Sequence, residues 1–383
     1  MAKVLMKGNE AIGEAAISAG CKHFFGYPIT PQSELPAYLA RKLPQIGGVF
    51  LQAESEISAI NMVYGAAAAG ARVLTGSSSP GISLKQEGIS YIAGAELPAV
   101  IINVMRGGPG LGGVQPSQSD YFQATKGGGH GDYHLIVLAP ASVQETVDLV
   151  RLAFDLADKY RNPAMILSDG LLGQMMEPVD FGDYHPTIPA KPWALSGSGH
   201  RKRVVVASEP IDYHRTELIT RSETDDHNIV TSIYIQPEVL EKHNRNLQAK
   251  YAAIRKKEQR AERWMAEDAE ILVVAYGSVS RIVKSSIKRA RKKGIPVGLI
   301  RPITLWPFPE NEFVDLGKAK AILVMELSAG QMVEDVRLTV NGRLPVHLYG
   351  RMGGMVPSIE ELLREIEKAY EATRQEVTHG KSF

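Results

Sequence analysis

The sequence of 383 residues contains one cysteine, Cys21, and this scarcity excludes several kinds of chemistry. One thiol forms no disulfide within the chain, no Cys-x-x-Cys redox pair and no four-thiolate cluster site. The ten histidines are scattered, with no His-Glu-x-x-His motif, so we expect no metal site in this chain. Any iron–sulfur cluster that takes part in the function must therefore belong to a partner.

An excess of one charge and a long apolar run are also missing. The 43 Lys and Arg residues balance 42 Asp and Glu residues, which gives no electrostatic case for binding nucleic acid or an anionic membrane. Apolar runs such as Ala99–Met105 are too short to span a bilayer. The N-terminal residues lack the apolar core and cleavage site of a signal peptide. We therefore predict a cytoplasmic protein that binds neither nucleic acid nor membrane.

The sequence instead alternates short apolar segments with helical stretches, which predicts an α/β fold with a mostly parallel sheet. In the first half, the expected strands are His23–Gly26, Val49–Gln52, Arg72–Thr75, Ala99–Val104, Leu135–Ala139 and Ala164–Ser168. The expected helices are Pro31–Lys42, Ser55–Ala69, Ser83–Ala93 and Ser142–Tyr160. Ligands of such sheets bind where the strands end, so the loops after the strands are the candidate site.

The pattern predicts three parts: a first α/β domain over 1–190, an excursion or lid with a long linking helix over 191–268, and a smaller α/β domain over 269–383. The middle part has one strand candidate, Arg203–Ala207, and one charged helix, Glu238–Glu267. This helix carries an apolar stripe formed by Leu240, Leu247, Tyr251 and Ile254. It would serve either as an interdomain strut or as a subunit-docking helix.

The last part repeats the alternation of strands and helices. Its expected strands are Ile271–Tyr276, Val297–Ile300, Ala321–Met325 and His347–Tyr349. Its expected helices are Ser280–Lys292, Met332–Asn341 and Ser358–Arg374. About 110 residues suffice for a small core of its own.

A glycine-rich loop follows one of the expected strands. Gly108–Gly113 matches Gly-x-Gly-x-x-Gly, but the residues after it include a proline and show no apolar period, so they do not open the helix that a dinucleotide site needs. We interpret the segment as an exposed active-site loop. Arg106, just before it, is either a surface charge or a bidentate clamp for a carboxylate. His130 and His134 follow at a distance and are either catalytic or structural.

Two further segments end strands with polar residues. Thr30 precedes Pro31, which suits the first position of a helix, so Thr30 either caps that helix or helps its amides to hold a substrate carboxylate. Glu54 and Glu56 open a helix of small apolar residues whose faces we expect to be buried. One of these carboxylates then points into the protein or toward a ligand, where burial raises the pKa of a carboxyl as acid–base chemistry requires. The alternative is a carboxylate that only interacts with the helix dipole.

Together these segments resemble the α subunit of the 2-oxoacid:ferredoxin oxidoreductases. The similar segments of the first domain are, in order, Tyr27–Pro31, Gln52–Ile57, Ser78–Ser83 and Met105–Pro109. Those of the second domain are Ala275–Ser278, Leu299–Phe308 and Gln331–Val336. Within this family, Gly65–Val73 and Gly127–Tyr133 are most similar to the 2-oxoisovalerate, or branched-chain, group.

The resemblance implies a thiamine-diphosphate-binding domain of the pyrimidine type, followed by a domain like the C-terminal domain of transketolase. The cofactor would be shared with a β subunit that carries the diphosphate and Mg²⁺ site, consistent with the absence of Gly-Asp-Gly here. Further implied partners are a γ subunit, a small ferredoxin-like δ subunit and ferredoxin. A 2-oxoacid would be oxidatively decarboxylated, with electrons passing to [4Fe-4S] clusters of the partners and the acyl group to coenzyme A.

The resemblance also implies roles for individual residues. Glu56 would hydrogen-bond the aminopyrimidine ring nitrogen and favour the imino tautomer, with Glu54 as the alternative. Thr30 and Arg106 would contact the carboxylate of the 2-oxoacid. The cofactor-binding residues would be Tyr27, Pro28, Ile29, Glu56, Ser79 and Pro80.

Other functions stay open at this point. Although 2-oxoisovalerate is favoured, 2-oxoglutarate or an aryl 2-oxoacid would suit the same chemistry. A distal carboxylate would require a second cation, for which Arg72, Lys85 and Lys126 are candidates. The chain would alternatively belong to a thiamine enzyme without clusters, or be a non-catalytic scaffold subunit.

Overall fold

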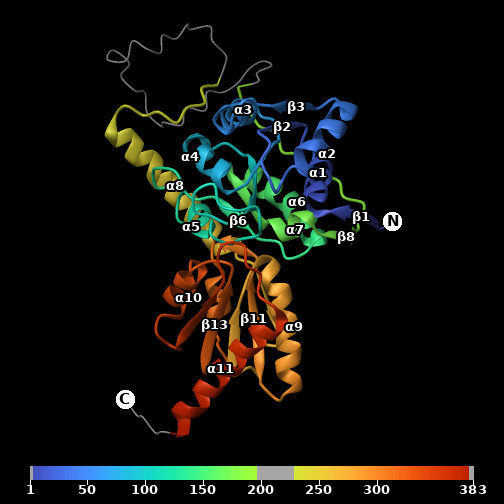
Figure 1. The fold of residues 1–383 in the computed structure, drawn as a ribbon. Coiled ribbons are helices and arrows are strands. Elements are labelled where there is room, and N and C mark those ends of the chain that lie inside the picture. Colours follow the sequence, from blue (N-terminus) through green and yellow to red (C-terminus); the bar gives the residue numbers. More distant parts are fainter. Residues whose placement is uncertain (1–2, 196–227, 379–383) are drawn as a thin grey trace.

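The computed structural model describes residues 3–195 and 228–378, which form two α/β parts stacked one on the other (Figure 1). The first part is built on a seven-stranded sheet in the order β12-β6-β7-β5-β4-β2-β3, in which only β12 is antiparallel to its neighbour. Its strands are β2 (His23–Gly26), β3 (Val49–Gln52), β4 (Val73–Ser77), β5 (Val100–Met105), β6 (Ile136–Leu138), β7 (Ala164–Asp169) and β12 (Thr304–Trp306). The predicted α/β class is confirmed, whereas the predicted strand Arg203–Ala207 lies outside the described residues.

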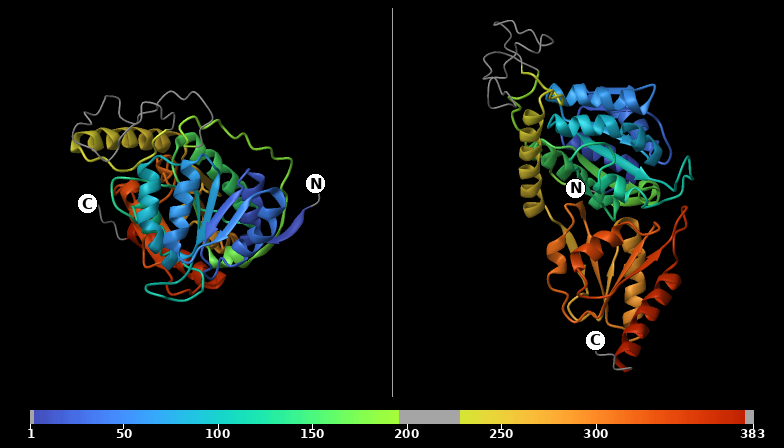
Figure 2. Two further views of the ribbon diagram at one scale, coloured as in Figure 1. Left: turned by 90° about the horizontal axis from the view of Figure 1, so that it is seen from above. Right: turned by 90° about the vertical axis from the view of Figure 1, so that its left-hand side faces the viewer.

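Helices cover both faces of this sheet (Figure 2). One face carries α1, α2 and α6, and the other carries α3 and α4, which pack on each other. The helices of this part are α1 (Gly8–Ser18), α2 (Glu34–Lys42), α3 (Glu56–Ala68), α4 (Ser79–Gly94), α5 (Tyr121–Thr125), α6 (Val143–Tyr160) and α7 (Gly170–Gln174), with the 3₁₀ helix η1 (Leu43–Ile46). A separate antiparallel pair joins β1 (Val4–Lys7) to β8 (Met176–Val179).

The second part has a five-stranded sheet in the order β14-β13-β10-β11-β9. Its strands are β9 (Ala261–Trp264), β10 (Ile271–Val274), β11 (Val297–Pro302), β13 (Ala321–Glu326) and β14 (Val346–Gly350). Its helices are α9 (Gly277–Lys292), α10 (Met332–Val340) and α11 (Ile359–Thr378), with the 3₁₀ helix η3 (Glu310–Phe313). Only β9 runs antiparallel, against β11.

Alternate residues of the second sheet belong to two different cores, as the two-residue period of a strand requires. Ile271 and Val273 of β10 pack with α9 and α11. Leu272 and Val274 of the same strand belong, together with residues of α10, to the cluster that also fills the first part. One face of the second sheet therefore shares its core with the first part.

The long charged helix ends ten residues earlier than the sequence predicts. The expected helix was Glu238–Glu267, whereas α8 spans Pro237–Lys257 and is followed by β9. Tertiary contacts override the helical preference there, because the backbone of Arg260 bonds Ile303 and Thr304. Of the predicted apolar stripe, Leu247, Tyr251 and Ile254 are buried, while Leu240 is 38% exposed.

The buried stripe of α8 packs on the first part of the same chain. The Tyr251 ring contacts His134 and Trp306 edge-on, and His243 Nε2 lies 2.8 Å from Gly94 O. Helix α8 accordingly runs along the first part toward the second (Figure 1). This packing fits the predicted strut.

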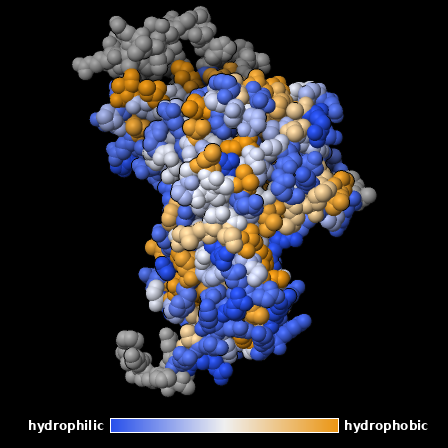
Figure 3. Space-filling model, in the orientation of Figure 1, coloured by the Kyte–Doolittle hydropathy of each residue, from blue (hydrophilic) through white to orange (hydrophobic). Residues whose placement is uncertain are grey.

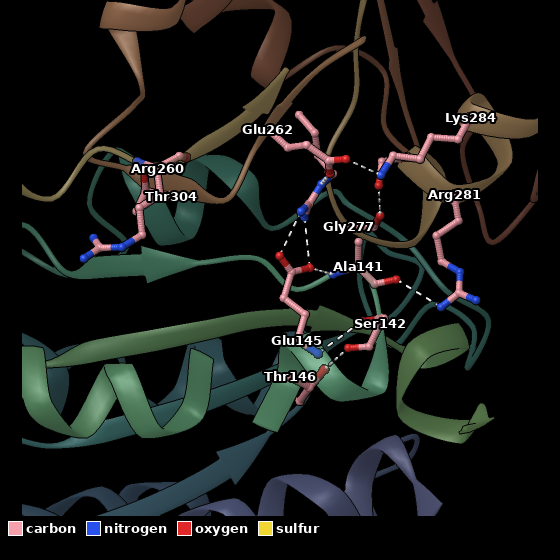
Figure 4. Close-up of polar contacts among 12 residues, drawn as sticks. Ala141, Ser142, Glu145, Thr146, Arg260, Glu262, Gly277, Arg281, Lys284 and Thr304 are labelled. Carbon is pink, nitrogen blue, oxygen red and sulfur yellow. Dashed lines mark hydrogen bonds and ion pairs between the residues drawn. The ribbon is translucent and has the colours of Figure 1, made fainter. Parts of the chain in front are cut away.

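Buried charges hold the two parts together. Arg301 of β11 donates from both terminal nitrogens to Glu145 of α6, at 2.8 and 3.0 Å, and from Nε to Glu262 of β9 at 2.7 Å. Figure 4 shows Glu145 and Glu262 on the two sides of this junction, with Lys284 pairing Glu262. The predicted motif Leu299–Phe308 thus supplies both this arginine and strand β12, which joins the first sheet.

The other second-domain motifs also build the junction. The Gln118 side chain donates to Tyr276 O and accepts from Leu327 N–H, both at 2.9 Å. Ser278 Oγ donates to Asp169 Oδ2 at 2.5 Å, and Gln331 Oε1 accepts from Phe122 N–H at 2.8 Å. These family-like segments therefore fix how the second part sits on the first.

Over residues 3–195 and 228–378, none of the helices is both apolar enough and long enough to traverse a bilayer. On the face that Figure 3 shows, orange apolar groups are scattered over the first part, and the lower end of the second part is mainly hydrophilic.

Candidate active site

The polar segments singled out in the sequence meet at one edge of the first sheet. Strands β2, β3, β4 and β5 are adjacent, and their carboxyl ends lead respectively to Thr30, Glu56, the serines after β4, and Arg106. Parallel strands place all their carboxyl ends at the same edge, so residues distant in sequence become neighbours.

Glu56 and Glu54 have opposite environments. Glu56 is the first residue of α3 and is buried, with 6% of its surface exposed. Glu54 is exposed, and a hydrogen bond from the Ser58 hydroxyl lowers the pKa of its carboxyl. Ser55 caps the helix by accepting from Ser58 N–H at 3.2 Å, so neither glutamate is needed as the cap. Only Glu56 satisfies the expectation of an inward carboxylate.

The Glu56 carboxylate lies against the start of α4, where a glycine leaves room for it. A Cβ at position 81 would lie 2.6 Å from Glu56 Oε1 and would overlap Ser77 Oγ. The hydroxyls of Ser77 and Ser78 are buried and have no hydrogen-bond partner within the described part of the chain. A buried carboxylate beside two unpartnered hydroxyls is a donor and acceptor set suited to a polar ligand.

Ser79 links the start of α4 to the arginine. Its hydroxyl donates to Asp120 Oδ2 at 2.6 Å and accepts from Arg106 N–H at 3.0 Å. Asn103 completes the group by donating to the same Asp120 oxygen at 2.9 Å. Burial raises the pKa of the Asp120 carboxyl, while the Ser79 and Asn103 hydrogen bonds oppose the rise. The predicted cofactor residue Ser79 is thus engaged within the protein and holds the backbone of Arg106.

The Arg106 guanidinium joins two of the predicted segments. It is buried and donates from Nη1 to Thr30 O at 2.9 Å and from Nη2 to Leu111 O at 3.0 Å. Its Nε is buried without an acceptor among the described residues. The structure therefore brings Thr30 and Arg106 together, and these two bonds use two of the five N–H donors of the guanidinium.

The Thr30–Pro31 segment does not start a helix, which corrects the predicted helix Pro31–Lys42. Helix α2 begins at Glu34 and its N-cap position is Ser33, so Thr30 is not a helix cap and holds no helix N-terminus. The reason is tertiary, because Pro31 O accepts from the side-chain amides of Asn9 and Gln174 instead of a helical N–H.

Helix α4, in contrast, starts earlier than predicted, at Ser79 and not at Ser83. Pro80 falls in the first turn of the helix, where its missing N–H costs nothing. The segment that we expected to be a loop is therefore a second helix start beside the start of α3.

The remaining predicted cofactor residues lie at the outer rim. Tyr27 and Pro28 are exposed, while Ile29 and Pro80 are half-buried. The glycine loop folds back on itself instead of opening a helix, since Gly113 N–H bonds Gly107 O at 2.9 Å and Gly107 N–H bonds Gln115 O. This geometry agrees with the rejection of a dinucleotide site.

The histidines and two of the candidate cations lie away from this edge. His134 precedes β6 and stacks on Trp306 with 4.5 Å between ring centres, and burial lowers the pKa of its imidazole. Arg72 precedes β4, at the opposite edge, and pairs with Asp155 and Asp158. Arg72, one of the three candidate cations, is therefore not at the carboxyl edge of the sheet.

Lys126 pairs with Asp335 of the second part, and Lys85 is fully buried beneath α3. His130 is exposed, and its carbonyl accepts from Ser90 Oγ. Neither histidine contacts the carboxyl-edge group.

Sequence reasoning missed Ser77 and Asp120 at this site, and it considered Lys85 only as a candidate cation for a distal carboxylate. A signal for Ser77 was present, since three serines followed by Pro-Gly end an otherwise apolar strand. Asp120 and Lys85 carry no such local signal, because their burial is created by distant segments.

Comparison with known families matches almost the whole chain. Residues 14–263 match the pyruvate flavodoxin/ferredoxin oxidoreductase domain described as thiamine-diphosphate-binding. Residues 269–362 match core domain II of pyruvate:ferredoxin oxidoreductase.

Curated relatives are similar over nearly their full length. A ketoisovalerate oxidoreductase subunit VorB from Methanothermobacter marburgensis is 50% identical over 370 residues, covering 96% of this chain and 98% of the relative. A 2-oxoglutarate synthase subunit KorA from Methanocaldococcus jannaschii is 38% identical, covering 94% and 98%.

Solved structures agree at the level of the fold. The 2-oxoglutarate:ferredoxin oxidoreductase from Magnetococcus marinus, solved with 2-oxoglutarate, coenzyme A and succinyl-CoA bound, superposes with a TM-score of 0.81 at 28% identity. The alignment covers 96% of this chain and 65% of that one. A split-gene transketolase has a TM-score of 0.57 at 13% identity, which shows similarity of fold alone.

Proposed function

The chain belongs to the 2-oxoacid:ferredoxin oxidoreductase family, and on this premise we propose that it is the α subunit of a thiamine-diphosphate enzyme that converts 2-oxoisovalerate to an acyl-CoA and CO₂. Glu56 is its catalytic residue. The observation that carries the proposal is a buried carboxylate that meets the buried, unpartnered Ser77 hydroxyl around Gly81, where β4 leads into α4.

The residues present fit the aminopyrimidine end of the cofactor. When bound, thiamine diphosphate supplies the nucleophilic carbon that attacks the 2-oxo group. Glu56 would hold or release a proton at the ring nitrogen, and the hydroxyls of Ser77 and Ser78 would satisfy polar atoms of the ring. Gly81 would keep the carboxylate accessible, because a Cβ there would collide with it. Pro28, Ile29 and Pro80 would form the apolar rim.

The 2-oxoacid carboxylate would be oriented by Arg106. Its guanidinium is held by Thr30 O and Leu111 O, and its other N–H groups, including the unpartnered Nε–H, would be available to the ligand. The carboxylate leaves as CO₂, so a small number of donors would orient the substrate without overstabilising its ground state. Thr30 would contribute its hydroxyl from the exposed side.

An apolar substrate side chain agrees with the surrounding charges. A distal carboxylate would need a free cation, yet Lys126 pairs with Asp335 and Arg72 lies at the opposite edge of the sheet. The third candidate, Lys85, is fully buried, and its Nζ donates to oxygen atoms of strand β4. The ketoisovalerate relatives are also more similar than the 2-oxoglutarate relatives, at 48–50% against at most 41% identity. Both observations favour 2-oxoisovalerate over 2-oxoglutarate, and nothing described here favours an aryl 2-oxoacid.

The proposal includes partners that complete the site. A β subunit would hold the diphosphate and Mg²⁺, and γ and δ subunits with [4Fe-4S] clusters would pass electrons to ferredoxin. The single cysteine of this chain is consistent with clusters in partners.

The test compares Glu56→Gln with Glu54→Gln in the reconstituted complex. Reduction of a viologen dye is followed with 2-oxoisovalerate, 2-oxoglutarate and phenylpyruvate, with and without coenzyme A. We expect CoA-dependent activity with 2-oxoisovalerate, a loss of at least about 100-fold in Glu56→Gln, and near-normal activity in Glu54→Gln. Full activity of Glu56→Gln would refute the catalytic assignment and favour a scaffold role. A colourless complex without visible absorbance would favour a thiamine enzyme that uses no clusters.

A further inference from the structure

A closed set of hydrogen bonds surrounds the backbone of Arg106, where strand β5 ends. Arg106 N–H donates to Ser79 Oγ at 3.0 Å, and the same oxygen lies 3.2 Å from Arg106 O. Ser79 N–H in turn donates to Asn103 Oδ1 at 3.2 Å. Both backbone polar groups of the arginine therefore face one serine hydroxyl, and the orientation of this hydroxyl decides which of them it bonds.

Asp120 sets that orientation. A serine hydroxyl carries one hydrogen and two lone pairs, so it cannot donate fully to Asp120 Oδ2 and to Arg106 O at once. Asp120 Oδ2 is the nearer acceptor, at 2.6 against 3.2 Å, which leaves a lone pair of Ser79 Oγ for Arg106 N–H. Asn103 Nδ2 fixes the carboxylate by donating to the same oxygen at 2.9 Å. These four residues are buried, so water does not readily replace a lost bond.

The second part of the chain holds Asp120 in place. Two residues before it, Gln118 N–H donates to Leu327 O at 2.9 Å. Directly after it, the Tyr121 hydroxyl donates to Asp335 Oδ2 at 2.5 Å. The segment that carries Asp120 is thus attached on both sides across the junction. Through this residue, the second part contributes to the geometry of the site.

We propose that Asp120 is a positioning residue that acts through the Ser79 hydroxyl to hold the backbone of Arg106, so that the guanidinium reaches the substrate carboxylate. The inference rests on the proposed function, in which Arg106 orients that carboxylate. Thr30 O and Leu111 O hold two N–H groups of the guanidinium. Its other N–H groups keep a constant direction only if the backbone of the arginine is held as well.

The first measurement is the kinetics of Asp120→Ala in the reconstituted complex. Without the carboxylate, the Ser79 hydrogen is free to turn to Arg106 O, and the guanidinium loses its fixed direction. We expect the KM for 2-oxoisovalerate to rise about tenfold, while kcat changes less and the KM for coenzyme A stays the same. Asp120→Asn keeps an oxygen that can accept both hydrogen bonds, as Oδ2 does, and should restore a KM near the wild-type value.

Asp158→Ala is the matched control. Asp158 is an aspartate of the first part whose side chain is 2% exposed, and it accepts from Arg72 Nε at 2.7 Å at the opposite edge of the sheet. Its removal should lower stability and leave the KM for 2-oxoisovalerate unchanged. An equal rise of the KM in both variants would show that the effect follows general destabilisation, and would overturn the inference.

A double variant tests whether Asp120 acts through the arginine. Arg106→Ala removes the guanidinium, so the addition of Asp120→Ala should raise the KM no further. A KM well above that of Arg106→Ala would show that Asp120 acts by another route, contrary to the inference.

The second measurement needs no activity and uses the full chain by itself. Amide hydrogen exchange, resolved to single residues, reports on the N–H of Arg106 that Ser79 Oγ accepts. Asp120→Ala should accelerate this exchange about tenfold, and Asp158→Ala should leave it unchanged. Ser79→Ala, which removes one oxygen, should accelerate it as well and serves as the second variant if Asp120→Ala does not fold. Unchanged exchange in the folded variant would contradict the proposed contact.

The outcomes separate this inference from the proposed function. A raised KM in Arg106→Ala together with an unchanged KM in Asp120→Ala would overturn the role of Asp120 and leave the function standing. An unchanged KM in Arg106→Ala, or full activity of Glu56→Gln, would overturn the proposed function itself. The exchange of Arg106 N–H would still report on the Asp120 contact in that case.

Discussion

The Glu56 site and the Arg301 junction both bury charged side chains, but only the junction pairs them. Arg301 uses all three of its guanidinium nitrogens on Glu145 and Glu262. At the site, the hydroxyls of Ser77 and Ser78 and the Nε of Arg106 have no partner among the described residues. Buried polar groups in proteins are nearly always satisfied, so the unpartnered groups agree with the proposal that the Glu56 site binds a ligand, while the paired junction is structural.

Because of this difference, we expect substitutions at the junction to lower stability and substitutions at the site to affect binding or catalysis. A fully paired group loses stability when one partner is removed, because the others stay buried without compensation. A polar group that has no partner within the protein contributes little to stability, and its removal should affect ligand binding or catalysis instead. Four substitutions at three places, in order of decreasing effect on stability, test this contrast.

Arg301→Ala should be the most destabilising of these changes. It leaves Glu145 and Glu262 without their arginine, at a cost of about 3 kcal/mol in the free energy of unfolding. The measurement is urea denaturation of the full chain at pH 7. As a control, Arg289→Ala removes an exposed pair with Glu360 and should cost less than about 1 kcal/mol. Equal losses in both variants would show that the junction charges are no more than surface pairs.

Ser278→Ala should have an intermediate effect. Ser278 Oγ donates to the buried Asp169, the removal of a partnered hydroxyl costs about 1–2 kcal/mol, and burial already raises the pKa of this carboxyl. A raised native pKa means that stability falls as the pH rises above the unfolded value, and the lost hydrogen bond should extend that fall to higher pH. Unfolding measured between pH 4 and 8 checks the extension, and an unchanged upper end of the fall would contradict it.

Ser77→Ala and Ser78→Ala should change stability least. Their buried hydroxyls bond no described group, so removal should alter the free energy of unfolding by less than about 0.5 kcal/mol. Thiamine diphosphate affinity of the assembled complex, measured by calorimetry, should instead fall several-fold. A stability loss as large as that of Ser278→Ala would show that these hydroxyls have structural partners and that the contrast with the junction is false.

Much of the fold and of the candidate site could be predicted from the sequence. Short apolar segments predicted the bounds of β2 and β3 to the residue, because each is a short apolar run of strand length. The motifs around Thr30, Glu56 and Arg106 also indicated a common edge, because each follows a strand. Helix α1 was not anticipated, since its small residues are buried nearly all round and show no amphipathic period.

What the sequence determined by itself was therefore the order of the elements, the family and the residue types that carry the chemistry, because these follow from local periodicity and short motifs. The tertiary structure alone decided which of two glutamates is buried, where α2 and α8 begin or end, and that Lys85 is fully buried. Each of these outcomes depends on atoms supplied by distant segments, such as Asn9 at Pro31 O and Thr304 at the Arg260 backbone. Burial and hydrogen-bond partners are properties of the packed chain, and no local pattern encodes them.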